Sequence, residues 1–222
     1  MKEVVLDTET TGLNVRDGHR IVEIGCIELE NQIPTSNKVH YYLNPERKVS
    51  EKAFEVHGYT DEFLSSQKKF SEICDEFLEF IKDKKLIIHN AVFDLSHLNN
   101  ELNLIGKKKI NKDSTIDTLE LARNKYPGSQ ISLDALCKRF RIDNSRRIKH
   151  TALVDCELLS KVYINLIDQK EPTLDFKVIE NDKISFNSSS DKYCKNIIYP
   201  TKEELGLHKQ YLKSNLKKNF FS

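Results

Sequence analysis

Two acidic side chains stand two residues apart near the start of the chain, in the stretch Val4-Val5-Leu6-Asp7-Thr8-Glu9. The apolar, β-branched residues before them predict a buried strand, which the following Thr-Thr-Gly ends. Because side chains alternate across a strand, Asp7 and Glu9 are expected on one face and Thr8 on the other. Neighbouring carboxylates at the end of a core strand repel each other and require a cation. No Lys or Arg follows until Arg16, which favours a metal ion.

An Asp-x-Glu pair can also be a solvated strand end, so the metal hypothesis needs further ligands. Asp94 stands where a helix is predicted to begin, and Asp155 lies in the last predicted core helix. Four carboxylates can hold two divalent cations about 3.5–4 Å apart, an arrangement suited to phosphodiester hydrolysis. Oxygen ligands favour Mg²⁺ or Mn²⁺ over zinc. The alternative for Asp94 is a helix cap or a partner of the helix dipole.

A histidine, His150, stands five residues before Asp155. On one continuous helix this offset is about 140° around the axis, so the two side chains would face different directions. If His150 instead lies in a loop before the helix, it can reach the same site. An imidazole with a pKa near about 6.5 is suited to take a proton from the attacking water. The alternative is a surface histidine with no part in the chemistry.

Hydrophobic periodicity predicts the elements that must position these residues. Further strands are expected over 21–29 and 39–43, and three strands before any long helix predict an antiparallel meander. Residues 54–59 are interpreted as a short irregular segment. The remaining predicted elements are a strand over 86–88 and helices over 70–81, 89–105, 118–124, 132–140 and 152–167, with Ser132 as an N-cap. The pattern predicts an α/β fold with a mixed sheet flanked by helices.

Composition limits the possible partners of the chain. Its 222 residues include 35 basic and 34 acidic side chains, so a nucleic acid would have to bind at a local patch. The scattered cysteines have no C-x-x-C spacing and are interpreted as reduced thiols: Cys26, Cys74, Cys137, Cys156 and Cys194. We expect a cytoplasmic protein, because there is no leader-like N-terminus and no apolar run long enough for a membrane span.

Three segments together resemble the exonuclease motifs of the DEDD family. They are Asp7-x-Glu9, His89-Asn90-Ala91-x-Phe93-Asp94 and His150-x-Ala152-x-x-Asp155, and the histidine five residues before the last aspartate is typical of the DEDDh branch. Further matching segments are Ile21–Gly25, Val56–Gly58, Asp117–Arg123 and Ser132–Cys137. They extend over residues 1–167 and are similar to the proofreading epsilon subunits of bacterial DNA polymerase III.

The resemblance implies a ribonuclease H-like fold and 3′→5′ hydrolysis that releases nucleoside 5′-monophosphates from single-stranded or frayed DNA 3′ ends. It implies that Asp7 bridges two divalent cations, Mg²⁺ or Mn²⁺. Glu9 and Asp155 would complete the first metal site, Asp94 would serve the second partly through water, and His150 would be the general base. The residues expected to contact the terminal nucleotide are Thr10, Thr11, Leu13, His57 and Asn90.

One departure from the epsilon pattern lies beside the expected base. Thr151 stands where the epsilon subunits usually have Gly. A β-branched residue restricts the backbone without touching a ligand. We therefore expect this departure to alter the reaction rate and not to abolish activity.

The chain is predicted to have three parts. The resemblance implies an exonuclease domain at 1–168 and a polymerase-binding helix at 201–222, and the polar composition of residues 169–200 indicates a linker between them. In the linker, the segment Glu171–Phe176 is a candidate sliding-clamp peptide with Leu174 and Phe176 as apolar anchors. In the tail, a capping box precedes an apolar stripe that includes Leu205 and Leu212, which is expected to bind the polymerase alpha subunit. The alternative is that the tail folds back onto its own domain.

A small theta-like accessory subunit is a further expected partner. Two other functions stay open at this point. A DEDDh ribonuclease that trims RNA 3′ ends would carry the same core motifs, although the linker and tail disfavour it. A polymerase scaffold with a silent nuclease would not need five catalytic side chains.

Overall fold

The computed structural model describes residues 2–147, 149–167 and 199–215. The chain divides into two compact units, Met1–Asp175 and Phe176–Ser222, which are described separately below. The expected clamp-peptide anchors, Leu174 and Phe176, lie outside the described residues. The described cysteines, at positions 26, 74, 137 and 156, are free and buried, as expected for reduced thiols.

The first unit is built on a five-stranded mixed sheet in the order β3-β2-β1-β4-β5. Strands β1 (Lys2–Thr10), β2 (Ile21–Glu30) and β3 (Ile33–Tyr42) form the predicted antiparallel meander. Strands β4 (Lys85–Ile88) and β5 (Thr115–Asp117) continue the sheet in parallel beside β1. The prediction of β3 over 39–43 was too short, because the first half of this edge strand, residues 33–37, is mostly exposed and lacks an apolar alternation.

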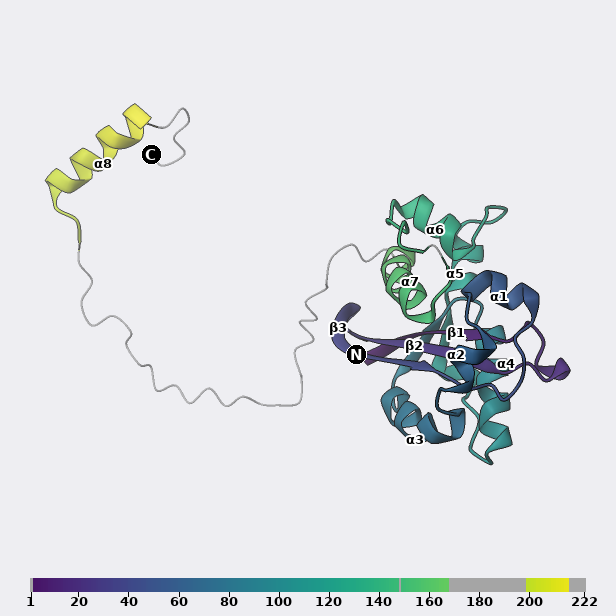
Figure 1. Ribbon diagram of the computed structural model, residues 1–222. Coiled ribbons are helices and arrows are strands. Elements are labelled where there is room, and N and C mark those ends of the chain that lie inside the picture. Colours follow the sequence, from purple (N-terminus) through teal and green to yellow (C-terminus); the bar gives the residue numbers. More distant parts are fainter. Residues whose placement is uncertain (1, 148, 168–198, 216–222) are drawn as a thin grey trace, which may run out of the picture. The chain divides into compact units, whose positions relative to one another are not determined.

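Helices cover both faces of this sheet (Figure 1). Alternate residues of β1 enter two separate cores: Val4 and Leu6 pack in one, and Val5 packs in the other. The first core is closed by α3 (Phe70–Ile81) and α4 (Ala91–Leu104). The second is closed by α5 (Thr118–Lys125), α6 (Leu133–Phe140) and α7 (Ala152–Leu166). This arrangement confirms the predicted mixed sheet between helices.

The segment after β3 is helical, which corrects the prediction of an irregular stretch over 54–59. Helix α1 (Glu51–His57) begins at Ser50, whose Oγ accepts the Ala53 N–H at 3.3 Å. It ends at Gly58, whose φ of 78° is the left-handed conformation that glycine adopts at a helix end. Helix α2 (Asp61–Ser65) follows. The smaller elements not predicted are the 3₁₀ turns η1 (Val15–Asp17) and η2 (Lys112–Ser114) and strand β5.

The described part of the second unit consists of α8 (Lys202–Asn215) and the residues just before it. The predicted capping box is present: the Thr201 N–H donates to the Glu204 carboxylate at 2.7 Å, and the Glu204 N–H donates to Thr201 Oγ1 at 3.2 Å. Leu205, Leu207 and Tyr211 are exposed on this helix. Within the described part of the second unit, these apolar side chains of α8 stay exposed.

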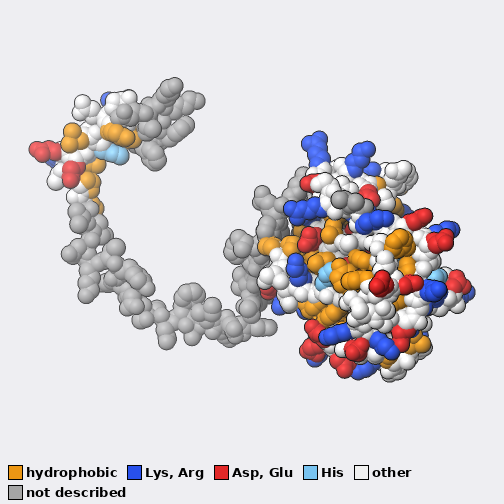
Figure 2. Space-filling view, in the orientation of Figure 1, with side chains coloured by type: hydrophobic (Ala, Val, Ile, Leu, Met, Phe, Trp, Pro, Cys, Tyr) orange, Lys and Arg blue, Asp and Glu red, His pale blue; other side chains and the backbone are white. Residues whose placement is uncertain are grey.

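The surface charge of the first unit is mixed. On the face shown in Figure 2, acidic, basic and apolar side chains are interspersed over the first unit. This distribution agrees with the nearly equal numbers of basic and acidic residues in the sequence.

Within the described ranges, no helix combines the length and the apolar character that crossing a membrane requires.

Candidate active site

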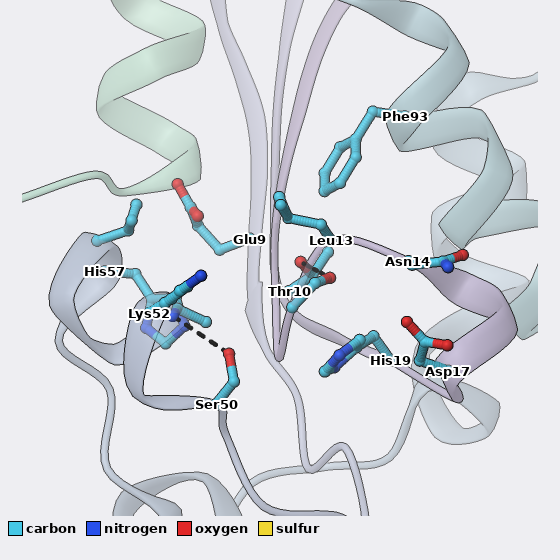
Figure 3. A pocket seen from close by; sticks show the side chains of 13 residues that line it. Glu9, Thr10, Leu13, Asn14, Asp17, His19, Ser50, Lys52, His57 and Phe93 are labelled. Atoms are coloured by element: carbon cyan, nitrogen blue, oxygen red, sulfur yellow. Dashed lines mark hydrogen bonds between the residues drawn. The ribbon is translucent and has the colours of Figure 1, made fainter.

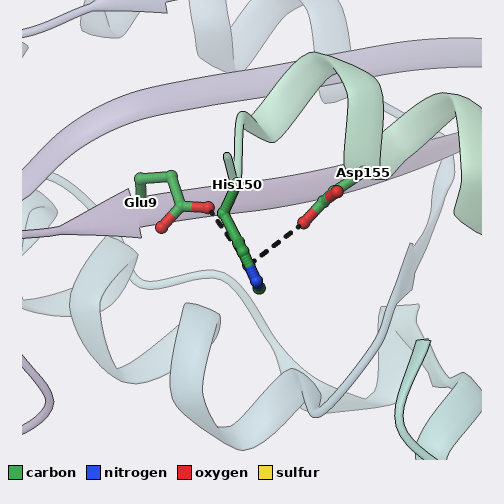
Figure 4. Close-up of side chains that lie close together, drawn as sticks. All are labelled: Glu9, His150 and Asp155. Carbon is green, nitrogen blue, oxygen red and sulfur yellow. Dashed lines mark ion pairs between the residues drawn. The ribbon is translucent and has the colours of Figure 1, made fainter. Parts of the chain in front are cut away.

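Three of the predicted site residues converge at the end of β1. His150 Nδ1 lies 3.6 Å from Asp155 Oδ2 and 4.0 Å from Glu9 Oε1 (Figure 4). Their ligand atoms all lie within 4.8 Å of one another. Helix α7 begins only at Ala152, so His150 belongs to the loop before it, and its backbone N–H donates to the Val56 carbonyl at 3.2 Å. Because His150 lies in the loop, its side chain can face Asp155, which the five-residue offset would not allow on one continuous helix.

The first turn of α7 approaches the sheet very closely at Gly25 of β2. A Cβ atom at this position would lie 2.6 Å from the backbone carbon of Ala152. Because glycine has no Cβ, α7 can lie directly against the strand and bring Asp155 toward Glu9. Thr151, the residue that departs from the epsilon pattern, is extended with φ −136° and ψ 131°, a conformation that suits a β-branched side chain.

Asp94 reaches the same end of the sheet from the first turn of α4, on the opposite face of β1. Its Oδ1 accepts the Thr8 backbone N–H at 3.0 Å and the Thr8 hydroxyl at 2.7 Å. Thr8 points away from the face that carries Asp7 and Glu9, as alternation along the strand predicts. The role of Thr8 in fixing Asp94 was not predicted, because the contact joins residues 86 positions apart.

The site concentrates negative charge in a poorly solvated region. Burial, together with repulsion from Asp155 and Glu23, raises the pKa of Glu9 to about 8. Burial also raises the pKa of Asp94 to about 7, although the Thr8 hydrogen bonds oppose the shift. The pKa of Asp7 is raised well above its usual range by burial and then by repulsion from Asp94 and Glu9. Carboxylates whose ionisation is opposed by burial and by mutual repulsion fit divalent cations, which favour the charged form.

A cationic side chain that the sequence did not reveal also reaches this site. The Arg147 guanidinium donates to both carboxylate oxygens of Asp155, from Nε at 2.6 Å and from Nη2 at 2.7 Å. Nη2 also lies 2.9 Å from His150 Nδ1. The sequence around Asp7 has no Lys or Arg until Arg16, but Arg147 reaches the carboxylates from a distant part of the chain. An arginine three residues before His150 was the signal that could have indicated this contact.

A cavity of about 460 Å³ opens beside Glu9 and the turn that follows β1. It is lined by the predicted substrate residues Thr10, Leu13 and His57, together with Phe93 of α4. Figure 3 shows the α1 side of the cavity, with His57, across the end of β1 from Phe93. Leu13 is 81% exposed at the rim. The cavity places apolar and aromatic surface next to the carboxylates, as a nucleotide base requires.

Two predicted substrate residues do not line this cavity. Thr11 is fully buried behind it, where its Oγ1 lies 3.0 Å from His19 Nδ1 and accepts the Arg20 N–H at 3.1 Å. Asn90 is the N-cap of α4 with φ 71°, and its N–H donates to Asp117 Oδ1 at 3.1 Å. Both residues hold the backbone around the site, and neither belongs to the cavity wall.

A family model and similar known proteins agree on the family of this chain. Residues 4–163 match the family model described as Exonuclease. DNA polymerase III subunit epsilon of Rickettsia felis is 47% identical over 224 residues, which cover 98% of this chain and 98% of that protein. The protein of the same name from Escherichia coli is 46% identical over 171 residues, or 73% of this chain and 70% of its own.

Solved structures agree on the fold. The nuclease domain of 3′hExo, a DEDDh family member, has a TM-score of 0.66 at 18% identity, covering 76% of this chain and 92% of that domain. Exonuclease X in complex with 5′ overhanging duplex DNA has a TM-score of 0.60 at 23% identity, covering 75% of this chain and 92% of its own. The sheet and its helices are thus ribonuclease H-like, as predicted. The chain therefore belongs to the exonuclease family and is a 3′→5′ exonuclease that resembles the epsilon subunits of bacterial DNA polymerase III.

Proposed function

We propose that this protein removes misincorporated nucleotides from DNA 3′ ends with a two-metal site held by four carboxylates: Asp7, Glu9, Asp94 and Asp155. The observation that carries the proposal is the convergence of Glu9, His150 and Asp155, whose ligand atoms lie within 4.8 Å of one another. The ions are Mg²⁺ or Mn²⁺, because the ligands are oxygen atoms. When bound, they supply positive charge that offsets the charge on the attacking and leaving oxygens.

His150 is the proposed general base. Burial and the nearby Arg147 lower its pKa below the usual value of 6.5, so the ring is neutral at neutral pH and can accept a proton from water. Its side chain is 43% exposed, which leaves it accessible from solvent. The Val56 carbonyl holds its backbone in place. These features suit a base that acts at the edge of the carboxylate cluster.

The cavity beside Glu9 is the proposed site for the terminal nucleotide. Phe93 and Leu13 offer apolar surface for a base, and His57 lies across the cavity. A mispaired 3′ end costs less free energy to unpair than a paired one, so it enters a single-strand site more often. Selection against mispairs therefore requires no contact that recognises the mispair itself.

The two-part organisation of the chain supports a role inside a polymerase assembly. The relatives are named as subunits of DNA polymerase III, and α8 carries exposed Leu205 and Leu207 that can bind a partner. We propose that 1–168 is the nuclease, 169–200 a linker and 201–222 the alpha-subunit tether, in the cytoplasm. A sliding clamp at Leu174 and Phe176 and a theta-like subunit on the nuclease domain complete the proposed partners.

The catalytic proposal is tested with the purified full chain and 5′-labelled oligonucleotides in Mg²⁺ or Mn²⁺. The substrates are single-stranded DNA, primer–templates with paired or mispaired 3′ ends, and RNA. We expect stepwise 3′ shortening of DNA, faster at mispairs, and a rate reduced by about 10²–10⁴ in His150→Ala. His208→Ala, a matched change on the exposed helix α8, should retain the full rate. A preference for RNA would instead indicate an RNA-trimming enzyme, and inactivity on every substrate would indicate a scaffold.

The assembly proposal is tested separately by size-exclusion chromatography with the polymerase alpha subunit. A chain that ends at Ile167 should keep its nuclease activity and no longer co-elute with the alpha subunit. Leu205→Ala/Leu207→Ala in the full chain should weaken co-elution without changing hydrolysis. Co-elution of the shortened chain would contradict the tether. Unchanged clamp affinity in Leu174→Ala/Phe176→Ala would contradict the clamp peptide.

A further inference from the structure

Arg147 occupies an unusual position for a cation in an enzyme that uses metal ions. Its side chain is only 7% exposed, and its fork faces Asp155 with two hydrogen bonds of 2.6 and 2.7 Å. A planar guanidinium matches a carboxylate in this paired geometry. Both oxygens of Asp155 are thus occupied by Arg147 in this arrangement. A divalent cation that uses the same carboxylate must compete with the guanidinium for it.

The same guanidinium also contacts the proposed base. Nη2 is 2.9 Å from His150 Nδ1, and because arginine can only donate, this ring nitrogen is the acceptor. His150 Nδ1 also lies 3.6 Å from the Asp155 carboxylate. Arg147 therefore holds one metal ligand and the base together. Its positive charge thus lies in direct contact with both residues.

A second acceptor lies ready at the outer side of Arg147. Nη1 donates to Asp134 Oδ2 at 2.6 Å, and the Asp134 side chain is 54% exposed in the first turn of α6. Asp134 is itself held by Asn144 Nδ2 at 2.8 Å. Arg147 can therefore give up Asp155 and keep an ion pair with Asp134 that is closer to solvent. In such an exchange Arg147 keeps Asp134 as its partner and Asp155 gains the metal ion, so neither is left as an unpaired buried charge.

We propose that Arg147 is an exchangeable counter-cation of the active site. It holds Asp155 and His150 in place before metal binds, and it releases Asp155 and keeps only Asp134 when a divalent cation takes Asp155. The inference rests on the proposed metal ligands, and it makes Arg147 a positioning residue. Its consequence is that metal affinity is set partly by how easily Arg147 is displaced.

The test measures Mn²⁺ binding to the full chain by isothermal titration calorimetry at fixed ionic strength. Arg147→Met removes the charge and keeps an unbranched chain of similar length. We expect its Mn²⁺ dissociation constant to fall by about tenfold or more, because a bidentate charged competitor is lost. Arg146→Met, the same change at the exposed neighbour, should leave the constant nearly unchanged. Arg147→Lys, which keeps the charge without the fork, should lie between wild type and Arg147→Met and serves if the Met variant fails to fold.

Thermal melts in EDTA provide a second readout. Without metal, Arg147→Met should melt below the wild type, because the site has lost its cation, whereas Arg146→Met should not. The difference should narrow in saturating Mn²⁺. A melting temperature equal to that of wild type in EDTA would overturn the holding role of Arg147.

A double-mutant cycle tests the part assigned to Asp134. Asp134→Asn should weaken Mn²⁺ binding in the wild-type background, because Arg147 then stays on Asp155. It should have no effect in the Arg147→Met background. An equal effect in both backgrounds would mean that Asp134 influences Mn²⁺ binding independently of Arg147, and it would overturn the exchange.

The outcomes separate this inference from the ligand assignment. If the wild-type chain binds no Mn²⁺, or if Asp155→Asn binds it as well as wild type, the proposed metal ligands are wrong. If the wild type binds Mn²⁺ and Arg147→Met binds it with the same affinity, the ligands stand and the counter-cation inference fails. An equal gain in Arg146→Met would also overturn the inference, because any nearby positive charge would then be sufficient.

Discussion

The Glu23 carboxylate accepts the backbone N–H of Ala152 at 3.0 Å and so attaches the first turn of α7 to strand β2. The same buried carboxylate accepts the Tyr59 hydroxyl at 2.8 Å and lies 2.6 Å from His40 Nε2. A helix N-terminus carries unsatisfied N–H groups and a partial positive charge, both of which favour a carboxylate. Glu23 is therefore a support for the segment that carries His150 and Asp155, although it does not belong to the proposed ligand set.

Replacing Glu23 by alanine should reduce both stability and activity. The change leaves the buried Ala152 N–H without its acceptor, at a cost of about 1–3 kcal/mol, and also removes the acceptor of the partly buried Tyr59 hydroxyl. We expect a lower denaturation midpoint and a lower kcat with a smaller change in KM. Tyr59→Phe is the matched control: it removes one hydrogen bond, should cost only about 1 kcal/mol, and should spare kcat. Equal kcat losses in the two variants would contradict the special role of the α7 contact.

Replacing Thr8 by valine should weaken metal binding. The change preserves shape but removes the 2.7 Å hydrogen bond from the hydroxyl to Asp94, leaving the backbone N–H as donor. Because that hydrogen bond lowers the Asp94 pKa, its loss should shift ionisation of Asp94 to higher pH. Calorimetry should show weaker Mn²⁺ binding, most clearly below pH 7. Thr35→Val, a change on the edge strand β3, should bind Mn²⁺ as the wild type does.

Replacing Gly25 by alanine should displace α7. The added Cβ would lie 2.6 Å from the backbone carbon of Ala152. Because the atoms that it meets belong to the backbone of α7, they cannot move aside as a flexible side chain could. Overpacking of this kind costs about 1–3 kcal/mol. We expect chemical denaturation to show that loss and oligonucleotide assays to show a larger fall in kcat. Gly206→Ala, where the new Cβ meets open space, should change neither measurement.

Stability in EDTA should fall as pH rises. The folded-state pKa values of about 8 for Glu9 and about 7 for Asp94 lie above the usual values of 4.5 and 3.8. The folded state therefore binds protons more tightly than the unfolded chain, so this contribution is present below about pH 4 and is lost as pH rises to about 8. Melting temperatures from pH 5 to 8.5 should show the decline, and Mn²⁺ should reduce it. A Glu9→Gln chain with the same slope as wild type would contradict the assignment.

The sequence predicted the parts of the site that depend on local spacing. Alternation in β1 placed Asp7 and Glu9 on one face, and the helical periodicity of residues 70–81 gave α3 its observed bounds. Helix α1 was missed because its Phe54 and Val56 are exposed and give no apolar period, although Ser50 and Gly58 mark its ends. Contacts between distant segments were not predictable in this way.

Glu23 shows why those contacts were missed. It meets the Ala152 N–H, 129 positions away, only after α7 has packed on the sheet, and no pattern in a single sequence specifies which polar side chains then face each other. A strand of three residues, such as β5, likewise gives too short an alternation to recognise. Its pairing with β4 is visible only once the fold is known.

The position of α7 at the end of the nuclease domain has a consequence for synthesis. The strand that carries Asp7 and Glu9 leaves the ribosome before the helix that carries Asp155. A nascent chain that has emerged only to Phe140 can pair β1 with β2 but lacks His150 and Asp155 altogether. Because domains generally fold as units, the growing chain can acquire nuclease activity only after α7 has emerged and docked against Gly25.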